Sequence, residues 1–365
     1  MRLTPKQRRN IHRILPFGII WLILSWIFMI YDLTLTRNQN LNPDTDINLT
    51  FPVMIFANFM ITLTGLLVGI LEVVVLERRF KQFALGKKII YKFVVYFLFM
   101  LTVITIAYPV AASIESGLSV LNLEIWNKLG RYYLSLTFLN TILQLSFFLL
   151  LSLIYSAISE NIGHQVFRNF FTGKYHKPKL EDRVFMFLDM KESTTIAEKL
   201  GNTKYFNFLK DYYAFMSGSI IQHLGEVYQY IGDEVVISWP KKSAIYQNNC
   251  LSLFWALKKS LKNQETKFME QYGFIPDFKA GLHIGEVTIG EIGALKKEIV
   301  FSGDVLNTTS RIQSLSKDYG EDLIISKELL EQLTLSNQIE SIMLGDLQLR
   351  GKSNSTKVYA IRFAS

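Results

Sequence analysis

Four long stretches of this chain contain no Asp, Glu, Lys, Arg or His, and they constrain its fold more than any other feature. They cover residues 14–31, 51–71, 93–114 and 132–159. Each has about 18 residues or more, which is the length that a helix needs to cross the hydrocarbon core of a bilayer. A helix of a soluble protein seldom stays apolar on all sides over such a length. The sequence therefore predicts four transmembrane helices, at about 14–34, 51–76, 89–114 and 132–159.

The charge of the connecting segments predicts how these helices are oriented. MRLTPKQRRNIHR before the first helix and ERRFKQFALGKK after the second are basic, whereas the other two connections are nearly balanced in charge. Because basic segments stay in the cytoplasm, we expect a multi-pass protein of the inner (cell) membrane, with both termini and the catalytic part cytoplasmic. Much of the net charge of +8 lies in these flanking segments. It indicates contact with anionic lipid of the bilayer rather than with nucleic acid.

One acidic residue falls near the cytoplasmic end of the second predicted helix. Glu72 follows three residues after Gly69, within an otherwise apolar run. We expect its carboxylate to reach the membrane surface or to pair with a nearby basic residue, namely Arg78, Arg79 or Lys81. The alternative is that it belongs to an ion path.

After the fourth helix the pattern changes to that of an α+β domain. Residues 160–180 form a linker whose apolar stripe either packs on its own domain or pairs with a second copy. From residue 181 onward, strand and helix patterns mix hairpins with crossovers, which predicts helices packed on a mostly antiparallel sheet. Residues 243–273 are expected to form one helix, and residues 277–293 a pair of strands with a glycine at the bend. The expected domains are thus 1–159, 160–180 and 181–365.

Two aspartates of this second half are candidates for a metal site. Asp189 ends the first strand, in FLDM, and Asp233 lies at the tip of the hairpin VYQYIGDEVVISWP. If the strand lies beside the hairpin, the two carboxylates converge, and their repulsion has to be offset by positive charge. Mg²⁺ suits this position because it binds one or two carboxylates and completes its coordination with phosphates and waters. The alternative is that both aspartates merely cap the ends of strands.

Three motifs in this order resemble the catalytic domain of the class III nucleotidyl cyclases, the adenylate and guanylate cyclases. VFMFLDMKESTTIAE resembles the first metal-binding segment and YIGDEVVISW the second, while KAGLHIGEVTIGEIG and FSGDVLNTTSRI resemble the glycine-rich strands and the Asn-x-x-x-Arg helix. The resemblance covers residues 181 to about 363 and implies a ferredoxin-like α+β fold. The expected fold class is thus multi-domain, with an all-α transmembrane four-helix domain before the cyclase domain. The family's sites combine two protomers, so the resemblance also implies a homodimer.

The resemblance assigns roles to the acidic and helical motifs. It implies two Mg²⁺ or Mn²⁺ ions on Asp189 and Asp233, and it implies that Asn307 orients the ribose and that Arg311 stabilises the transition state. Asn307 and Arg311 also stand four apart on a predicted helix and so project from one face. A guanidinium suits charge that develops on phosphate oxygens. For these two residues the alternative is an ordinary solvated helix face.

Further positions concern the phosphates and the turn that follows Asp189. The resemblance places Thr194 and the backbone of the turn at residues 190–194 near the phosphates. Lys352, in LRGKSNSTKVY, is the candidate phosphate-binding lysine, with Arg350 as the second choice and a plain basic turn as the alternative. Glu192 and Ser193 replace the Gly-Phe that is usual in this family. This difference concerns the packing of the phosphate turn rather than the metal.

Gln229 and Val300 occupy the positions that select the base in this family. Adenylate cyclases usually carry Lys and Asp there, and guanylate cyclases Glu and Cys. The amide of Gln229 offers a donor and an acceptor to a base, whereas Val300 can only shape the pocket. We expect ATP as the substrate, converted to 3′,5′-cyclic AMP and pyrophosphate, with GTP as the alternative. A third reading is a catalytically silent sensor that binds nucleotide.

Overall fold

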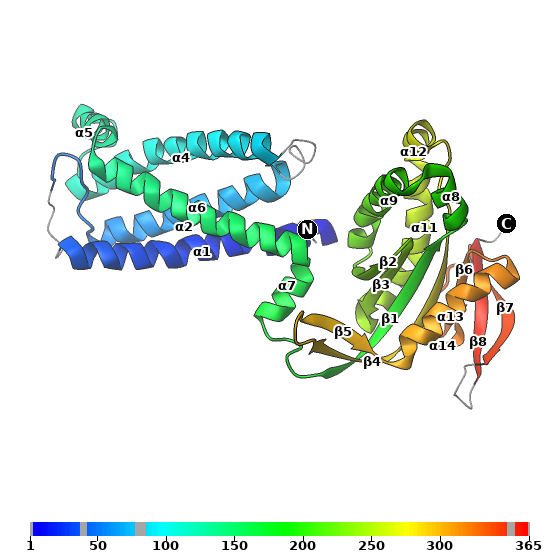
Figure 1. The fold of residues 1–365 in the computed structure, drawn as a ribbon. Coiled ribbons are helices and arrows are strands. Elements are labelled where there is room, and N and C mark those ends of the chain that lie inside the picture. Colours follow the sequence, from blue (N-terminus) through cyan, green and yellow to red (C-terminus); the bar gives the residue numbers. More distant parts are fainter. Residues whose placement is uncertain (1–2, 37–41, 77–84, 349–354, 364–365) are drawn as a thin grey trace. The chain divides into compact units, whose positions relative to one another are not determined.

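The computed structural model describes residues 3–36, 42–76, 85–348 and 355–363 (Figure 1). The chain divides into two compact units. One is helical and covers Gln7–Arg168, and the other is an α/β unit built mainly from Asn169–Ser365.

The helical unit is made of long apolar helices. They are α1 (Pro5–Thr36), α2 (Phe51–Ile70), which continues as the π-helix η1 (Leu71–Leu76), α4 (Leu85–Ser116), the short α5 (Leu123–Tyr133) and α6 (Leu136–Ile162). Among the described residues, four segments are long and apolar enough to cross a membrane: Pro5–Thr36, Phe51–Leu76, Tyr91–Ser116 and Leu136–Ile162. The prediction of four such helices is confirmed. The fourth begins at Leu136 because Ser135 caps it and accepts a hydrogen bond from the backbone N–H of Phe138 at 3.2 Å.

Buried polar side chains join the long helices of this unit. Trp21 Nε1 of α1 donates to Ser152 Oγ of α6 at 2.9 Å, and Ser25 of α1 donates to Asn58 of α2. A buried polar group is costly unless it finds a partner, so these bonds fix how α1 sits against its neighbours. Gly65 leaves the space for the Trp21 ring, since a Cβ there would lie 2.5 Å from Trp21 Cγ.

Glu72 takes its partners from a neighbouring helix rather than from the segment that follows it. It is buried, with 8% of its surface exposed, and it accepts hydrogen bonds from Lys92 Nζ and from Tyr96 OH, both on α4. The expected pairing with Arg78, Arg79 or Lys81 falls on residues outside the described ones. The ion pair with Lys92 joins η1 to α4 and neutralises the carboxylate within the bundle.

The α/β unit contains one mixed sheet. Within the described residues its strands are β1 (Lys179–Met190), β2 (Glu226–Ile231), β3 (Glu234–Pro240), β4 (Phe278–Ile292), β5 (Glu298–Ser302), β6 (Leu323–Ser326), β7 (Ile339–Gln348) and β8 (Ser355–Phe363). The strand order is β2-β3-β1-β4-β6-β8-β7, with β5 paired to β4. All pairs are antiparallel except β4 with β6. The prediction of a mostly antiparallel sheet is confirmed.

Helices cover both faces of this sheet (Figure 1). On one face, Met186 and Leu188 of β1 pack with Phe208 of α9 (Asn202–Gln222) and Phe254 of α11 (Asn249–Lys262). Side chains of a strand alternate between the two faces, so Phe187 packs on the other face, near α13 (Asp304–Tyr319). The remaining helices of the unit are α8 (Ser193–Leu200), α10 (Lys241–Ile245), α12 (Glu265–Tyr272) and α14 (Lys327–Leu330).

The glycines of KAGLHIGEVTIGEIG do not bend the chain into two strands, as the sequence pattern suggested. β4 runs unbroken, and two of these glycines allow α13 to lie directly on the sheet. A Cβ on Gly281 would lie 2.3 Å from the backbone N of Gln313, and one on Gly285 would lie 2.5 Å from Val305 Cγ2. A glycine inside a strand often marks such a close approach.

The prediction of one helix over residues 243–273 is also wrong. This region contains the end of α10, the 3₁₀-helix η2 (Tyr246–Asn248), α11 and α12. Gln247 and Asn248 adopt positive φ angles of 52° and 53°. L-residues with positive φ cannot continue a right-handed helix, so the chain breaks before α11 begins.

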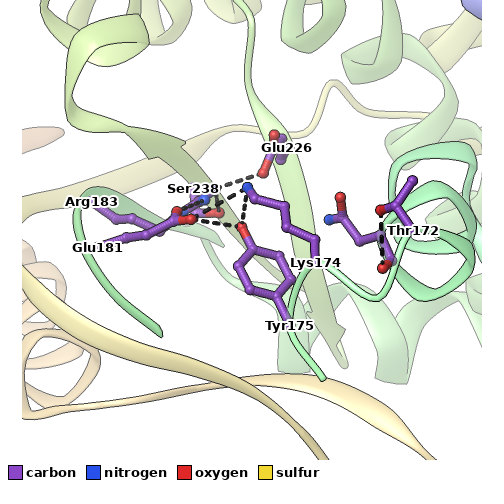
Figure 2. A network of polar contacts seen from close by, with 8 residues as sticks. Thr172, Lys174, Tyr175, Glu181, Arg183, Glu226 and Ser238 are labelled. Atoms are coloured by element: carbon purple, nitrogen blue, oxygen red, sulfur yellow. Dashed lines mark hydrogen bonds and ion pairs between the residues drawn. The ribbon is translucent and has the colours of Figure 1, made fainter. Parts of the chain in front are cut away.

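The linker reaches the sheet through a buried polar network (Figure 2). Gly163, with φ of 93°, separates α6 from the short α7 (His164–Phe171). After α7, Tyr175 is only 3% exposed and donates to Glu181 Oε1 at 2.9 Å. Arg183 is 1% exposed and donates to Glu181 Oε2 at 3.1 Å and to Glu226 Oε2 at 2.6 Å. Tyr175 is therefore part of the core of the α/β unit.

Candidate active site

Two aspartates lie together at one end of β1. The first strand does lie beside the hairpin, since β1 pairs with β3 up to Leu188 and Val235. Asp189 follows at the end of that pairing and faces Lys279 of β4 across the sheet. Asp233 lies in the turn between β2 and β3, directly after Gly232, whose φ is 61°. A glycine at this position permits the left-handed turn, and the turn carries the second carboxylate to the end of β1.

The site holds more negative than positive charge. Burial and the neighbouring carboxylate of Asp233 raise the pKa of Asp189. Lys279 offsets part of this effect, with its Nζ 3.4 Å from Asp189 Oδ2. Gln313 Nε2 of α13 donates to the same oxygen at 3.2 Å. Burial, with the charges of Asp189 and Asp233, also raises the pKa of Glu234 to about 7. Such shifts occur where like charges share a partly buried site.

The residues present fit a divalent metal ion. Asp233 Oδ2 is buried and has no hydrogen-bond partner among the described residues. A buried carboxylate oxygen without a partner is costly, and a cation shared with Asp189 would satisfy it and offset the repulsion. The described residues contain no group of three or more His, Cys, Asp and Glu that could hold a metal. The remaining ligands would therefore be waters and phosphate oxygens, as Mg²⁺ prefers.

The turn from β1 into α8 closely follows Asp189 in the chain. Glu192 adopts a left-handed conformation with φ of 55°. This backbone conformation is strained for a residue with a Cβ, whereas a glycine would adopt it without strain. Lys191 Nζ bridges Asp277 at 2.7 Å and Asp322 at 2.5 Å. Thr194 is exposed in the first turn of α8. Helix N-terminal N–H groups of this kind suit phosphate oxygens.

Asn307 and Arg311 project from the side of α13 that faces away from the sheet. Asn307 is exposed and Arg311 is partly exposed, whereas Ile312 and Gln313 are buried. Within the described part of one chain, neither Asn307 nor Arg311 forms a hydrogen bond or ion pair with Asp189. A single chain therefore brings the two carboxylates together and leaves the Asn and Arg pair apart from them.

The remaining candidates lie at the edges of the sheet or outside the described residues. Gln229 is exposed on β2, directly after an irregularity in the β2–β3 register. Val300 is half-buried on β5, opposite Gly290 of β4. Lys352 and Arg350 fall outside the described residues.

Sequence reasoning missed the side chains that hold Asp189. Lys279 is the first residue of KAGLHIG, and only the register of β1 against β4 shows that it faces Asp189. Gln313 belongs to the same helix as Asn307 and Arg311 but points to the sheet. No local pattern marks either residue, because their role depends on contacts between elements far apart in the chain.

Comparison with known proteins identifies the α/β unit. Residues 176–362, about half of the chain, match the family described as the adenylate and guanylate cyclase catalytic domain. Adenylate cyclase 2 of Rhizobium meliloti (strain 1021) is 30% identical over 208 residues, which cover 57% of this chain and 57% of that protein. The adenylate cyclase of Anabaena cylindrica is 25% identical over 189 residues, covering 48% of this chain and 36% of that protein.

A solved structure supports the fold. The structure of a bacterial light-regulated adenylyl cyclase aligns with a TM-score of 0.50 at 20% identity, covering 59% of this chain and 62% of that chain. The chain spans 57% and 36% of the length of the two curated relatives above.

Proposed function

The chain belongs to the adenylate and guanylate cyclase catalytic-domain family, and on that premise we propose that it is a membrane-bound adenylate cyclase. It converts ATP to 3′,5′-cyclic AMP and pyrophosphate for intracellular signalling. The observation that carries this proposal is the carboxylate pair at the end of β1, with Asp233 Oδ2 buried and unpartnered among the described residues. Domains of this family generally use divalent metal ions.

The resemblance to adenylate cyclases favours ATP over GTP. GTP stays the alternative substrate, since a receptor-type guanylate cyclase of Caenorhabditis elegans is 26% identical over 184 residues. Gln229 presents its amide from the exposed edge of β2, where it would meet the base, and Val300 would shape the same pocket. Thr194 and Lys352 would bind the phosphate groups of the substrate.

Asp189 and Asp233 are the proposed ligands of two Mg²⁺ or Mn²⁺ ions. When bound, such ions activate the 3′-hydroxyl and neutralise the leaving pyrophosphate. The ribose 3′-oxygen attacks the α-phosphate, and the protein positions the groups and stabilises charge. Lys279 and Gln313 both bind Oδ2 of Asp189, so they orient this carboxylate. Both residues thereby position a catalytic group.

The complete site forms between two copies of the chain. Asn307 and Arg311 lie on the outward side of α13, so a second protomer would bring them to the aspartates. There Asn307 would orient the ribose, and Arg311 would stabilise the negative charge that develops on the phosphate oxygens in the transition state. A C₂ dimer would contain two such sites.

The proposed domain organisation and membrane topology follow from the four apolar helices and the α/β unit. Residues 1–159 form the membrane domain, residues 181–365 the catalytic domain, and residues 160–180 a linker whose last part, with Tyr175, packs into the core of the catalytic domain. The protein crosses the inner membrane four times, and its termini and catalytic domain lie in the cytoplasm. Its partners are the bilayer and a second copy, and nucleic acid is not one of them.

Turnover of the purified full-length protein tests this function. With Mn²⁺ we expect cyclic AMP from ATP, and much less cyclic GMP from GTP at equal concentration. Asp233→Asn should lower turnover by about two orders of magnitude or more, since it removes a metal ligand. Asp318→Asn, the same change at an exposed position of α13, is the control. Nucleotide binding without any cyclic product would instead support a catalytically silent sensor.

Complementation tests the shared site. Asp233→Asn and Arg311→Ala are each expected to be inactive alone. Mixed in equal amounts, they form heterodimers that contain one intact site, so about a quarter of wild-type activity should return. No recovery from a mixture that is shown to exchange subunits would contradict the dimeric site.

A further inference from the structure

The helical unit contains a cavity that the proposed catalysis does not use. Its volume is about 560 Å³, within the range of about 300–1,000 Å³ that is typical of small-molecule sites. Its walls come from α1, α2, α4 and α6 and from Tyr132 of α5, with residues 45–49 of the loop between the first two. All of these lie in the helical unit, so the cavity belongs to one compact body.

The cavity occupies one end of the helical bundle. On the four long helices its lining residues fall within 25–36 of α1, 56–64 of α2, 100–111 of α4 and 136–148 of α6. These are the end of α1, the start of α2, the end of α4 and the start of α6. They lie away from Gly163, where α6 passes into the linker. In the proposed orientation, this end faces the outside of the cell.

The charged part of the lining is acidic. Asp32 and Asp46 both line the cavity, and the described lining residues include no Lys, Arg or His. Asp46 Oδ1 accepts hydrogen bonds from Thr137 Oγ1 at 2.6 Å and from Thr45 Oγ1 at 3.1 Å. Within the described chain, Oδ2 of the same carboxylate has no such donor and is available to a ligand. Arg131 donates to the backbone oxygen of Asp44 and is not part of the lining.

Another part of the lining is apolar and aromatic. Phe28 of α1 and Phe148 of α6 contact each other with ring centroids 5.3 Å apart, and Met60, Ile61 and Leu145 complete this wall. A pocket lined by carboxylates as well as by apolar and aromatic side chains fits a molecule with an apolar body and a cationic head. Aromatic rings near the carboxylates also favour a cation over a neutral head.

We propose that this cavity binds a small organic cation, an amine with a compact apolar body, and that Asp46 and Asp32 bind its ammonium group. An ion pair in apolar surroundings needs directed hydrogen bonds to offset desolvation, and an ammonium group offers three donors. Thr45 and Thr137 hold the Asp46 carboxylate in place for this contact. Anions and neutral analogues of the same shape lack the charge that the two carboxylates require.

The floor of the cavity is connected to the helix packing. Ser25 and Met29 both line it, and both contact Asn58, which accepts from Ser25 and donates to Met29 Sδ at 2.9 Å. One turn below on α1, Trp21 binds Ser152 of α6. A bound ligand would thus affect the packing of α1 against α6, the helix that leads to the linker. Regulation of the cyclase by this route rests on the proposed function, whereas binding itself does not.

Binding is tested on the full-length protein in neutral-lipid nanodiscs. The probes are hexylamine and 2-phenylethylamine as cations, hexanol as the neutral analogue and hexanoate as the anion, each followed by saturation-transfer NMR. We expect saturable binding of the amines, and affinities at least about tenfold weaker for hexanol and hexanoate, because hydrogen bonds to charged groups are the stronger ones. Cyclic AMP formation is measured separately, so loss of turnover with retained binding would count against the proposed function alone.

Three variants complete the test. Asp46→Asn should weaken amine binding about tenfold or more. Asp32→Asn should weaken it as well, and this variant disturbs no hydrogen bond of its side chain within the described residues, so it guards against a misfolded Asp46 variant. Asp44→Asn makes the same change at an exposed position of the same loop that does not line the cavity, and it should bind normally. Equal binding of all four probes, no saturable amine binding, or unchanged binding by both lining variants would overturn the proposal.

Discussion

Replacing Asp233 by Asn is expected to stabilise the metal-free protein and to abolish its activity. In the metal-free state, Asp189 and Asp233 place like charges at the end of β1, and Asp233 Oδ2 is buried without a partner among the described residues. Asn has nearly the same shape, removes one charge and supplies an amide donor beside Asp189. The residue that costs stability in the metal-free state is thus the one that the proposed chemistry needs.

The expected gain can be bounded from the charges of the site. Two unit charges about 4 Å apart interact by about 4 kcal/mol at an effective dielectric constant of about 20. Lys279 Nζ lies 3.4 Å from Asp189 Oδ2 and offsets much of the repulsion, and water reaches the partly exposed carboxylates. We therefore expect a net gain of about 1–2 kcal/mol in the free energy of unfolding. For a unit of this size, this raises the melting temperature by about 2–8 °C.

Thermal unfolding of the α/β unit in the full-length protein measures this effect. The unfolding temperature is recorded in EDTA and again with Mn²⁺, for the wild type, Asp233→Asn and the control Asp318→Asn. In EDTA the Asn variant should unfold at the higher temperature. Mn²⁺ at about 100 times its dissociation constant should stabilise the wild type by about 2.7 kcal/mol, and should stabilise the Asn variant much less.

Two results would refute this reasoning. If Asp233→Asn unfolds in EDTA at or below the temperature of the wild type, the two carboxylates do not repel each other in the way that the structure indicates. If the variant gains as much stability from Mn²⁺ as the wild type, Asp233 is not a metal ligand. A shift in Asp318→Asn of the same size would show that loss of any negative charge explains the result.

The structure makes three further predictions for the α/β unit. Glu192→Gly should raise the free energy of unfolding by about 0.5–1 kcal/mol, because it relieves a left-handed backbone at a side chain with a Cβ; a lower melting temperature would contradict this. Tyr175→Ala should lower the free energy of unfolding, measured by chemical denaturation, by about 3–4 kcal/mol, as for other buried aromatic residues. Tyr175→Phe should lower it by about 1 kcal/mol. Equal, small losses for both variants would show that Tyr175 does not belong to this core. Burial alone would raise the pKa of Glu181, but its bonds with Tyr175, Lys174 and Arg183 lower it overall. The stability that Glu181 contributes is therefore present above pH 4.5 and is lost as the pH falls through the lowered pKa of the folded state. In Glu181→Gln, the free energy of unfolding should fall less steeply over this acidic pH range.

Local patterns were enough to predict several elements of this protein. Charge-free runs predicted the membrane-spanning helices, because crossing a bilayer fixes both the length and the polarity of a segment. Alternating residues around Gly232 predicted the hairpin that carries Asp233. The helix ending near Gly320 was also predictable, since that glycine caps α13 with φ of 67° and supplies the left-handed residue that ends many helices.

Contacts between distant segments were decided only by the tertiary structure. A glycine of KAGLHIGEVTIGEIG was expected at a bend, whereas Gly281 and Gly285 prove to be points where α13 touches β4. Lys279 and Gln313 hold Asp189 only because of the β1–β4 register and the way α13 lies on the sheet. The partners of Glu72 on α4 and the acidic cavity within the helical unit likewise arise from packing. A periodic pattern records which face of an element is buried, but the identity of the neighbour depends on register and helix packing, which no local stretch of sequence encodes.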